Sequence, residues 1–186
     1  MKNYKKNLEL LTKNHVYSKD MEHDACGVGL IASTEGKKSR AIVEYGIEAL
    51  KAVWHRGAVD ADGKTGDGAG IHVEIPKDFF IEKIQVTGHD YDKSEICVGM
   101  IFLPRNDYAA QENCKTIVES ELTKNNFSIY GWRQVPVNPK VLGEKALQTM
   151  PEIIQVLFKS NDLNLLDKNL ERKIYETRKR IENKAF

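Results

Sequence analysis

The sequence predicts an α+β fold, in which helices and strands follow one another along one domain. Three stretches repeat apolar residues at helical spacing, and about five shorter stretches are apolar or alternating. The length of 186 residues suits a single domain, and 41% apolar residues are enough for a hydrophobic core. We therefore expect about five strands and three helices.

The period of the apolar residues marks three helices. The first is predicted over residues 39–54, with Gly57 beyond its end as a stop signal. The second is predicted over residues 107–124. The third begins near residue 167 and reaches Phe186 without a capping signal, so we expect the chain to be part of a longer polypeptide.

The predicted strands lie between these helices. Residues 26–32 are small and apolar, and residues 70–75 alternate and stop at Pro76. Residues 96–103 form a nearly continuous apolar run, which is typical of a strand covered on both faces. Two weaker candidates complete the set, residues 127–135 and 153–158.

Charge and composition exclude several classes of protein. The sequence holds 28 Lys and Arg against 27 Asp and Glu, so no basic field indicates a nucleic-acid partner. No apolar run approaches the roughly 18–20 residues of a membrane helix, and the first 25 residues lack the apolar core of a secretory signal. Three widely spaced cysteines argue against a disulfide framework. We expect a cytoplasmic chain with neither nucleic acid nor membrane as partner.

Residues 57–70 hold five glycines, too many for a helix or a regular strand. A phosphate-binding P-loop would need a glycine at position 58 and a preceding strand, and neither is found. A calcium loop starting at Asp60 would place Lys64 among the ligands, and no dinucleotide fingerprint has its strand–turn–helix context. Nucleotide binding here would require a phosphate ligand on residues 63–70. We expect Asp67 to organise this loop through backbone hydrogen bonds.

The histidines and two of the cysteines favour structural roles. Only His23 is spaced from a cysteine as zinc ligands are, and no second pair completes a site, so no metal is expected. Cys97 lies in the strongest strand and Cys114 on an apolar helix face, and we expect both to be small buried residues. Cys26 differs, because it follows a polar leader and opens a Cys-Gly-Val-Gly segment.

Four segments carry a resemblance to a known family. They are residues 26–29 (Cys-Gly-Val-Gly), 54–58 (Trp-His-Arg-Gly-Ala), 65–70 (Thr-Gly-Asp-Gly-Ala-Gly) and 130–136 (Tyr-Gly-Trp-Arg-Gln-Val-Pro). Together they resemble the N-terminal class II glutamine amidotransferase domain of the glutamate synthase family, of the Ntn-hydrolase type. The resemblance covers the chain from about residue 24. The last two segments point to glutamate synthase in particular, the first two to the class as a whole.

The resemblance implies a fold, a processing event and a reaction. The fold is a four-layer αββα sandwich, of which this chain would supply part. Residues 1–25 would be a propeptide, leaving residues 26–186 as the amidotransferase part. The reaction is the hydrolysis of glutamine to glutamate and ammonia through a γ-glutamyl thioester on Cys26.

A free amino group on Cys26 explains why the leader would have to be removed. An α-amino group has a reference pKa of about 7.7–8.0, close to the value of about 8.5 for a thiol, so it is able to take the thiol proton. An amide nitrogen is not basic enough to do so. Arg56 matches the arginine of the family's His-Arg-Gly motif and is the candidate substrate-binding residue; a structural ion pair in the glycine loop is the equally weighted alternative.

The family also implies features that this sequence does not contain. Its oxyanion hole comes from an Asn-Gly pair, and no Asn-Gly occurs here, so we expect the isolated chain to have weak or no glutaminase activity. In the whole enzyme the ammonia would be used to make glutamate from 2-oxoglutarate. That step would require FMN, an iron–sulfur cluster and NADPH or ferredoxin, none expected in this segment, with the other synthase domains and a small subunit as partners. Two alternatives remain: an amidotransferase domain serving another acceptor, and a non-catalytic scaffold with the same fold.

Overall fold

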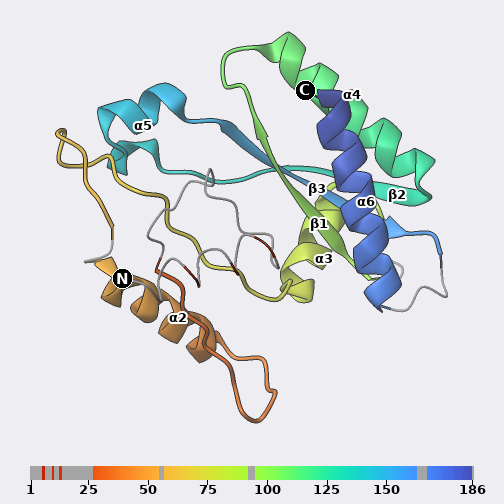
Figure 1. Ribbon diagram of the computed structural model, residues 1–186. Coiled ribbons are helices and arrows are strands. Elements are labelled where there is room, and N and C mark those ends of the chain that lie inside the picture. The colour runs from red at the N-terminus through yellow and green to blue at the C-terminus, as the bar shows by residue number, and fades with distance from the viewer. Residues whose placement is uncertain are drawn as a thin grey trace. The chain divides into compact units, whose positions relative to one another are not determined.

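The computed structural model describes most of the chain beyond residue 26. The described ranges are residues 27–54, 57–91, 95–162 and 167–185, together with the helical residues Lys6, Leu10 and Lys13. The chain divides into two compact units (Figure 1). The first comprises Met1–Ala58 and Asp67–Ile71, and the second comprises Val59–Gly66 and His72–Phe186.

The first unit contains one of the predicted helices. Helix α2 spans Arg40–Ala52, and the hydroxyl of Ser39 accepts a hydrogen bond from the backbone N–H of Ala41 at 3.2 Å. The strand predicted over residues 26–32 is wrong for its described part, because residues 27–32 are irregular and exposed. A strand needs a partner for its backbone groups, and none of the described strands pairs with this segment.

The second unit is built on a three-stranded antiparallel sheet. Its strands are β1 (Cys97–Leu103), β2 (Phe127–Gln134) and β3 (Glu152–Ser160), in the order β1-β3-β2. One of the two weaker candidates of the sequence, β3, is the central strand, with five consecutive buried residues. The prediction that β1 is covered on both faces is wrong. Among the described strands β1 lies at the edge of the sheet, and its Phe102 side chain is 64% exposed.

Two helices cover one face of this sheet. Helix α4 (Tyr108–Lys124) and helix α6 (Asp167–Ala185) contact each other, and Figure 1 shows them side by side. Both are predicted helices, and their apolar residues meet those of the strands in one core. Its buried members are Cys97, Val118, Leu122, Phe127, Val156 and Phe158, and Leu170, Ile174 and Ile181 of α6 pack against them.

A helix that the sequence did not predict packs in a second core. Helix α3 spans Lys77–Val86 and buries Phe80 and Ile84. These two side chains pack with Ile96, Tyr130 and Leu157. The strand predicted over residues 70–75 is wrong, since these residues are irregular and run into Pro76, the residue that caps α3. Two short elements, the 3₁₀ turn η2 (Pro139–Val141) and helix α5 (Glu144–Thr149), connect β2 to β3.

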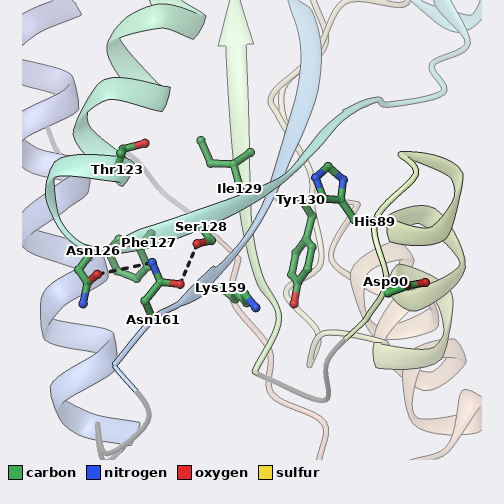
Figure 2. Close-up of a pocket in the computed structure, with 10 residues that line it drawn as sticks. All are labelled: His89, Asp90, Thr123, Asn126, Phe127, Ser128, Ile129, Tyr130, Lys159 and Asn161. Carbon is green, nitrogen blue, oxygen red and sulfur yellow. Dashed lines mark hydrogen bonds between the residues drawn. The ribbon is translucent and has the colours of Figure 1, made fainter.

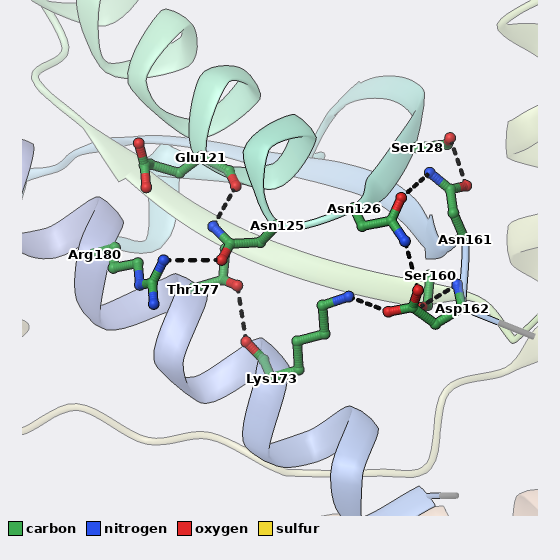
Figure 3. A network of polar contacts seen from close by, with 10 residues as sticks. All are labelled: Glu121, Asn125, Asn126, Ser128, Ser160, Asn161, Asp162, Lys173, Thr177 and Arg180. Carbon is green, nitrogen blue, oxygen red and sulfur yellow. Dashed lines mark hydrogen bonds and ion pairs between the residues drawn. The ribbon is translucent and has the colours of Figure 1, made fainter. Parts of the chain in front are cut away.

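Polar contacts fix α6 to the rest of this unit (Figure 3). The side chain of Glu121 on α4 is only 4% exposed, and its carboxylate pairs with Lys184. Lys173 pairs with Asp162 at the end of β3, and Arg180 donates to the side-chain oxygen of Asn125 at 3.1 Å. The lysine partners hold the pKa of both carboxyl groups, at Glu121 and Asp162, below the usual values.

The α+β prediction is confirmed: an antiparallel sheet is combined with helices, and the three predicted helices are present. The described residues contain one sheet, which agrees with the expectation that this chain supplies part of a four-layer sandwich. Among the described residues, no helix is both long enough and apolar enough to cross a membrane.

Candidate active site

The two residues predicted for the site, Cys26 and Arg56, lie outside the described residues. Their neighbours in sequence are described. Gly27 is exposed, and a Cβ added at Gly29 would meet no described atom within 4 Å. Gly57 donates a backbone hydrogen bond to the carbonyl oxygen of Trp54 at 3.0 Å. The described backbone after Cys26 is therefore open, and the backbone after Arg56 is hydrogen-bonded.

One of the other two cysteines, Cys97, does not fit a nucleophile. Cys97 is 5% exposed in the core, and burial, with a smaller effect of the carboxylates of Glu95 and Glu171, raises the pKa of its thiol to about 12. Such a thiol stays protonated at neutral pH and does not react. Cys114 is half-buried on α4. The expectation of a buried structural residue is confirmed for Cys97, while Cys114 is only partly covered.

The glycine-rich segment forms a short hairpin that begins just after Arg56. Val59 and Gly66 form a bridge, and Asp60 donates its N–H to the carbonyl oxygen of Thr65 at 2.7 Å. Gly63 makes the turn with φ +68°, a value that glycine adopts readily, and its N–H donates to the Asp60 carbonyl oxygen at 2.9 Å. The segment is thus an ordered loop.

Asp67 closes the base of this hairpin. Its carboxylate accepts the N–H of Ala58 at 2.9 Å, and its own N–H donates to the Ala58 carbonyl oxygen at 3.3 Å. The prediction that Asp67 organises the loop through backbone hydrogen bonds agrees with these contacts.

Asp62 is the residue that sequence reasoning missed. One carboxylate oxygen accepts the N–H groups of Lys64 and Thr65, at 2.9 and 2.7 Å, and the other accepts the Thr65 hydroxyl at 2.5 Å. These bonds, the Thr65 hydroxyl foremost, hold the pKa of Asp62 well below its usual range. The signal in the sequence was an Asp followed by Gly-Lys-Thr, the pattern of a turn capped by its own side chain.

The hairpin packs on the start of helix α5. Gly143, the residue before α5, is buried, and a Cβ added there would lie 2.1 Å from the Thr65 hydroxyl oxygen and 2.4 Å from a carboxylate oxygen of Asp62. Lys145 of α5 pairs with Asp60 at 2.6 Å. The N–H groups of residues 63–65 are all bonded within the hairpin, so this loop does not offer them to a phosphate.

The Tyr-Gly-Trp-Arg-Gln segment lies in β2 and holds elements together. The indole of Trp132 donates to Glu119 on α4 at 2.7 Å, and Arg133 donates to Gln155 on β3 at 2.6 Å. The register of β2 against β3 shifts between Ile129 and Gly131, which has φ +149°. A Cβ at Gly131 would lie 2.8 Å from a methyl carbon of Thr87. This motif therefore serves the fold.

A hollow in the second unit lies beside β2 and β3 (Figure 2). It is lined by His89, Asp90, Thr123, Asn126, Phe127, Ser128, Ile129, Tyr130, Lys159 and Asn161. Figure 2 shows Asn161 bonded to Ser128 and to Asn126, so part of the polar lining is already paired. None of the predicted site residues lines it. Among the described residues, no group of three or more His, Cys, Asp or Glu could hold a metal ion.

Comparison with known proteins gives a family and several relatives. Residues 26–186 match the family model of the class II glutamine amidotransferases. The chain is 52% identical over 179 residues to "Glutamate synthase [NADPH] large chain" of Azospirillum brasilense, covering 96% of this chain and 12% of that protein. It is 40% identical to "Ferredoxin-dependent glutamate synthase 1, chloroplastic/mitochondrial" of Arabidopsis thaliana, covering 87% of this chain and 10% of that protein. The chain therefore spans about a tenth of the length of these curated relatives.

Proposed function

The chain belongs to the class II glutamine amidotransferases, and on that premise we propose that it is the glutaminase part of a glutamate synthase. The observation that carries the proposal is the extent of the family match, which begins at Cys26. Cys26 is also the residue that the sequence indicates as nucleophile. The names of the similar proteins, from bacterial to plant glutamate synthases, support the choice of synthase.

In the proposed reaction the thiol of Cys26 attacks the side-chain amide carbon of glutamine. The free α-amino group of Cys26 takes the thiol proton, the amide carbon becomes tetrahedral and its oxygen becomes an oxyanion. The C–N bond then breaks, the amino group returns the proton to the departing ammonia, and a γ-glutamyl thioester remains. Water hydrolyses the thioester with the amino group again as base, which releases glutamate and regenerates the thiol.

Two further assignments belong to this proposal. Residues 1–25 are a propeptide whose removal frees the amino group of Cys26. Arg56 binds or orders the substrate, since a guanidinium forms paired hydrogen bonds with carboxylates.

The rest of the reaction would take place outside this segment. We propose that the ammonia is used by other domains of the same polypeptide to make glutamate from 2-oxoglutarate. FMN, an iron–sulfur cluster and NADPH or ferredoxin would serve that step; the names of two similar proteins specify NADPH and ferredoxin. A small subunit is a further proposed partner, and the proposed location is the cytoplasm.

An electrophilic glutamine analogue tests the glutaminase. We expect stoichiometric modification of the full-length protein at Cys26, located by peptide mass mapping, and a mature N-terminus at residue 26 by intact mass. The Cys114→Ala variant is the matched control and should be labelled like the parent. No labelling at Cys26 would favour the scaffold alternative, and active enzyme that still carries Met1 would refute the proposed base.

A further inference from the structure

Strand β1 has one edge without a partner among the described strands. It pairs with β3 along its whole length, from Cys97 to Leu103, and no described strand pairs with its other side. Its seven residues, Cys-Val-Gly-Met-Ile-Phe-Leu, include neither a charge nor a proline. Natural proteins use charges, prolines or irregularities to protect a free edge, because its unpaired backbone groups bind other strands. The sequence of β1 has none of the protecting residues.

The edge at β2, on the other side of the sheet, is protected. The register of β2 against β3 shifts between Ile129 and Gly131, and an irregularity of this kind disturbs pairing at an edge. The Thr87 hydroxyl donates to the backbone carbonyl oxygen of Tyr130 at 2.8 Å, so one backbone acceptor of β2 is already bound. Strand β2 also carries a charge, at Arg133. Of the two edges, β1 is therefore the one suited to receive another strand.

The side chains of β1 also leave an apolar surface uncovered. Met100 and Phe102 are 49% and 64% exposed, and Phe102 is in register with Ile153 of β3. We refer to Met100, Phe102 and Ile153 as the open face. Leu103 and Ile154, the next residues along the two strands, point to the opposite face and are buried. This end of the sheet is thus buried on one face and open on the other, although an apolar sheet face needs a second layer.

We infer that β1 is an interaction surface for another part of the same polypeptide, beyond residue 186. The occupant is an extended apolar segment that adds a strand to the free edge, and residues next to it cover the open face. The inference rests on the proposed function, in which this chain is one part of a longer synthase. The chain makes up 12% and 10% of the length of two similar proteins, so most of such a polypeptide lies outside it.

The open face is too small to hold a second copy of the chain. The exposed parts of its three side chains amount to on the order of 250 Å², whereas each partner in a stable complex of separate molecules buries about 800 Å². A segment of the same polypeptide has a high effective concentration through its covalent connection, so a smaller surface is enough. Backbone hydrogen bonds along β1 would supply the pairing, and the open face would select apolar side chains.

Photo-crosslinking in the full-length protein identifies the occupant. The crosslinking residue p-benzoylphenylalanine replaces Phe102 or, in the matched control, Tyr108, which is 77% exposed on α4 and lies outside the open face. We expect position 102 to crosslink to peptides beyond residue 186, and we expect the same peptides to be absent from the control. A mixture of isotopically labelled and unlabelled protein separates crosslinks within one polypeptide from crosslinks between two copies.

Hydrogen exchange of the unmodified full-length protein tests the strand pairing. The amides of β1 that point away from β3 should exchange more slowly than unstructured amides by a factor on the order of 100 or more, because a partner strand binds them. The amides of β1 that bond to β3 are the internal reference and should be slow with or without an added strand.

Three results would overturn the inference. They are crosslinks from position 102 only to residues 1–186 or only to a second copy, the absence of any crosslink, and exchange of the outward amides at the unstructured rate. Labelling of Cys26 by the glutamine analogue tests the proposed function in the same protein without involving β1. Failure of the proposed function is therefore distinguishable from failure of this inference.

Discussion

At the scale of single residues, burial makes the thiol of Cys97 inert. With its thiol pKa raised to about 12 by burial, Cys97 carries a thiolate fraction on the order of one in 10,000 at pH 8. We predict that iodoacetamide leaves Cys97 unmodified in the native protein at pH 8 and modifies it after denaturation, as measured by peptide mass mapping. Modification of native Cys97 as fast as of a denatured thiol would contradict its place in the core.

Gly131 offers a second prediction at this scale. Replacement by alanine puts a side chain at φ +149° and 2.8 Å from the Thr87 methyl carbon, and the backbone strain alone should cost roughly 1–3 kcal/mol of stability. The combined change with Thr87→Ser, which removes that methyl group and keeps the hydroxyl, should recover part of the loss. Chemical denaturation of the variants measures both effects.

The control for this prediction is Gly46→Ala in helix α2. An added Cβ meets nothing within 4 Å there, and alanine is the better helix former, so stability should be equal or higher. If Gly131→Ala were as stable as the parent, the irregularity in β2 would not need a glycine.

At the scale of elements, the attachment of α6 should depend on pH. The reference pKa of a glutamic acid is 4.5, and the Lys184 ammonium holds the pKa of Glu121 below it in the folded protein. The stabilising effect is therefore complete above pH 4.5 and is lost as the pH falls through the lower folded value. We predict that hydrogen exchange in α6 is slow at neutral pH and accelerates in this acidic range beyond the intrinsic pH effect.

The Glu121→Gln variant should remove this dependence. Its α6 amides should exchange faster than those of the parent at pH 7, and the two proteins should converge in acid. Glu112→Gln is the matched control, because Glu112 is exposed on α4, the helix that carries Glu121, and pairs with Lys115 on the surface. Equal exchange in Glu121→Gln and the parent at pH 7 would show that the ion pair does not secure α6.

The sequence predicts a helix correctly where the periodic pattern of apolar residues is long. Helices α2, α4 and α6 have 13, 17 and 19 residues, and each repeats its apolar residues over several turns. Helix α3 has 10 residues, and its apolar positions at Phe79, Phe80 and Ile81 are consecutive, so no helical period stands out. Its boundaries did carry signals, Pro76 before it and Gly88 at φ +80° after it.

The strand errors have a different cause. Residues 27–32 and 70–75 have apolar composition suited to a strand, but composition does not supply a hydrogen-bonding neighbour. Strand β3 was weakly predicted for the opposite reason: its burial comes from lying between β1 and β2, a pairing that no local pattern encodes. Similarly, the candidate nucleophile was found from its motif, whereas the close packing of Gly143 on Asp62 joins residues about eighty positions apart.

At the scale of the whole molecule, the proposed glutaminase needs parts that this sequence does not hold. The family's Asn-Gly oxyanion pair is absent here, and the chain spans about a tenth of the length of its curated relatives. We predict weak or no ammonia release from glutamine by the purified 186-residue chain, since an oxyanion donor contributes a factor of about 10²–10³ to the rate. The full-length protein in the same assay is the control.

A positive result with the short chain would have to pass one further check. Glutamine hydrolysis that disappears in Cys26→Ala would mean that the 186 residues form a working pocket by themselves. Hydrolysis that persists in Cys26→Ala would instead indicate a contaminating activity, and the prediction would stand.

The irregularity in β2 has a consequence for comparing this family's sequences. Ile129 and Trp132 pack against the same core although three positions separate them, an odd spacing that would send them to opposite sides of a regular strand. Gain or loss of one residue just before Trp132 would exchange the environments of Trp132 and Arg133 unless the offset moved with it. Alignments across this strand should therefore be anchored on Gly131. The alternation of apolar and polar residues should be read separately before and after it.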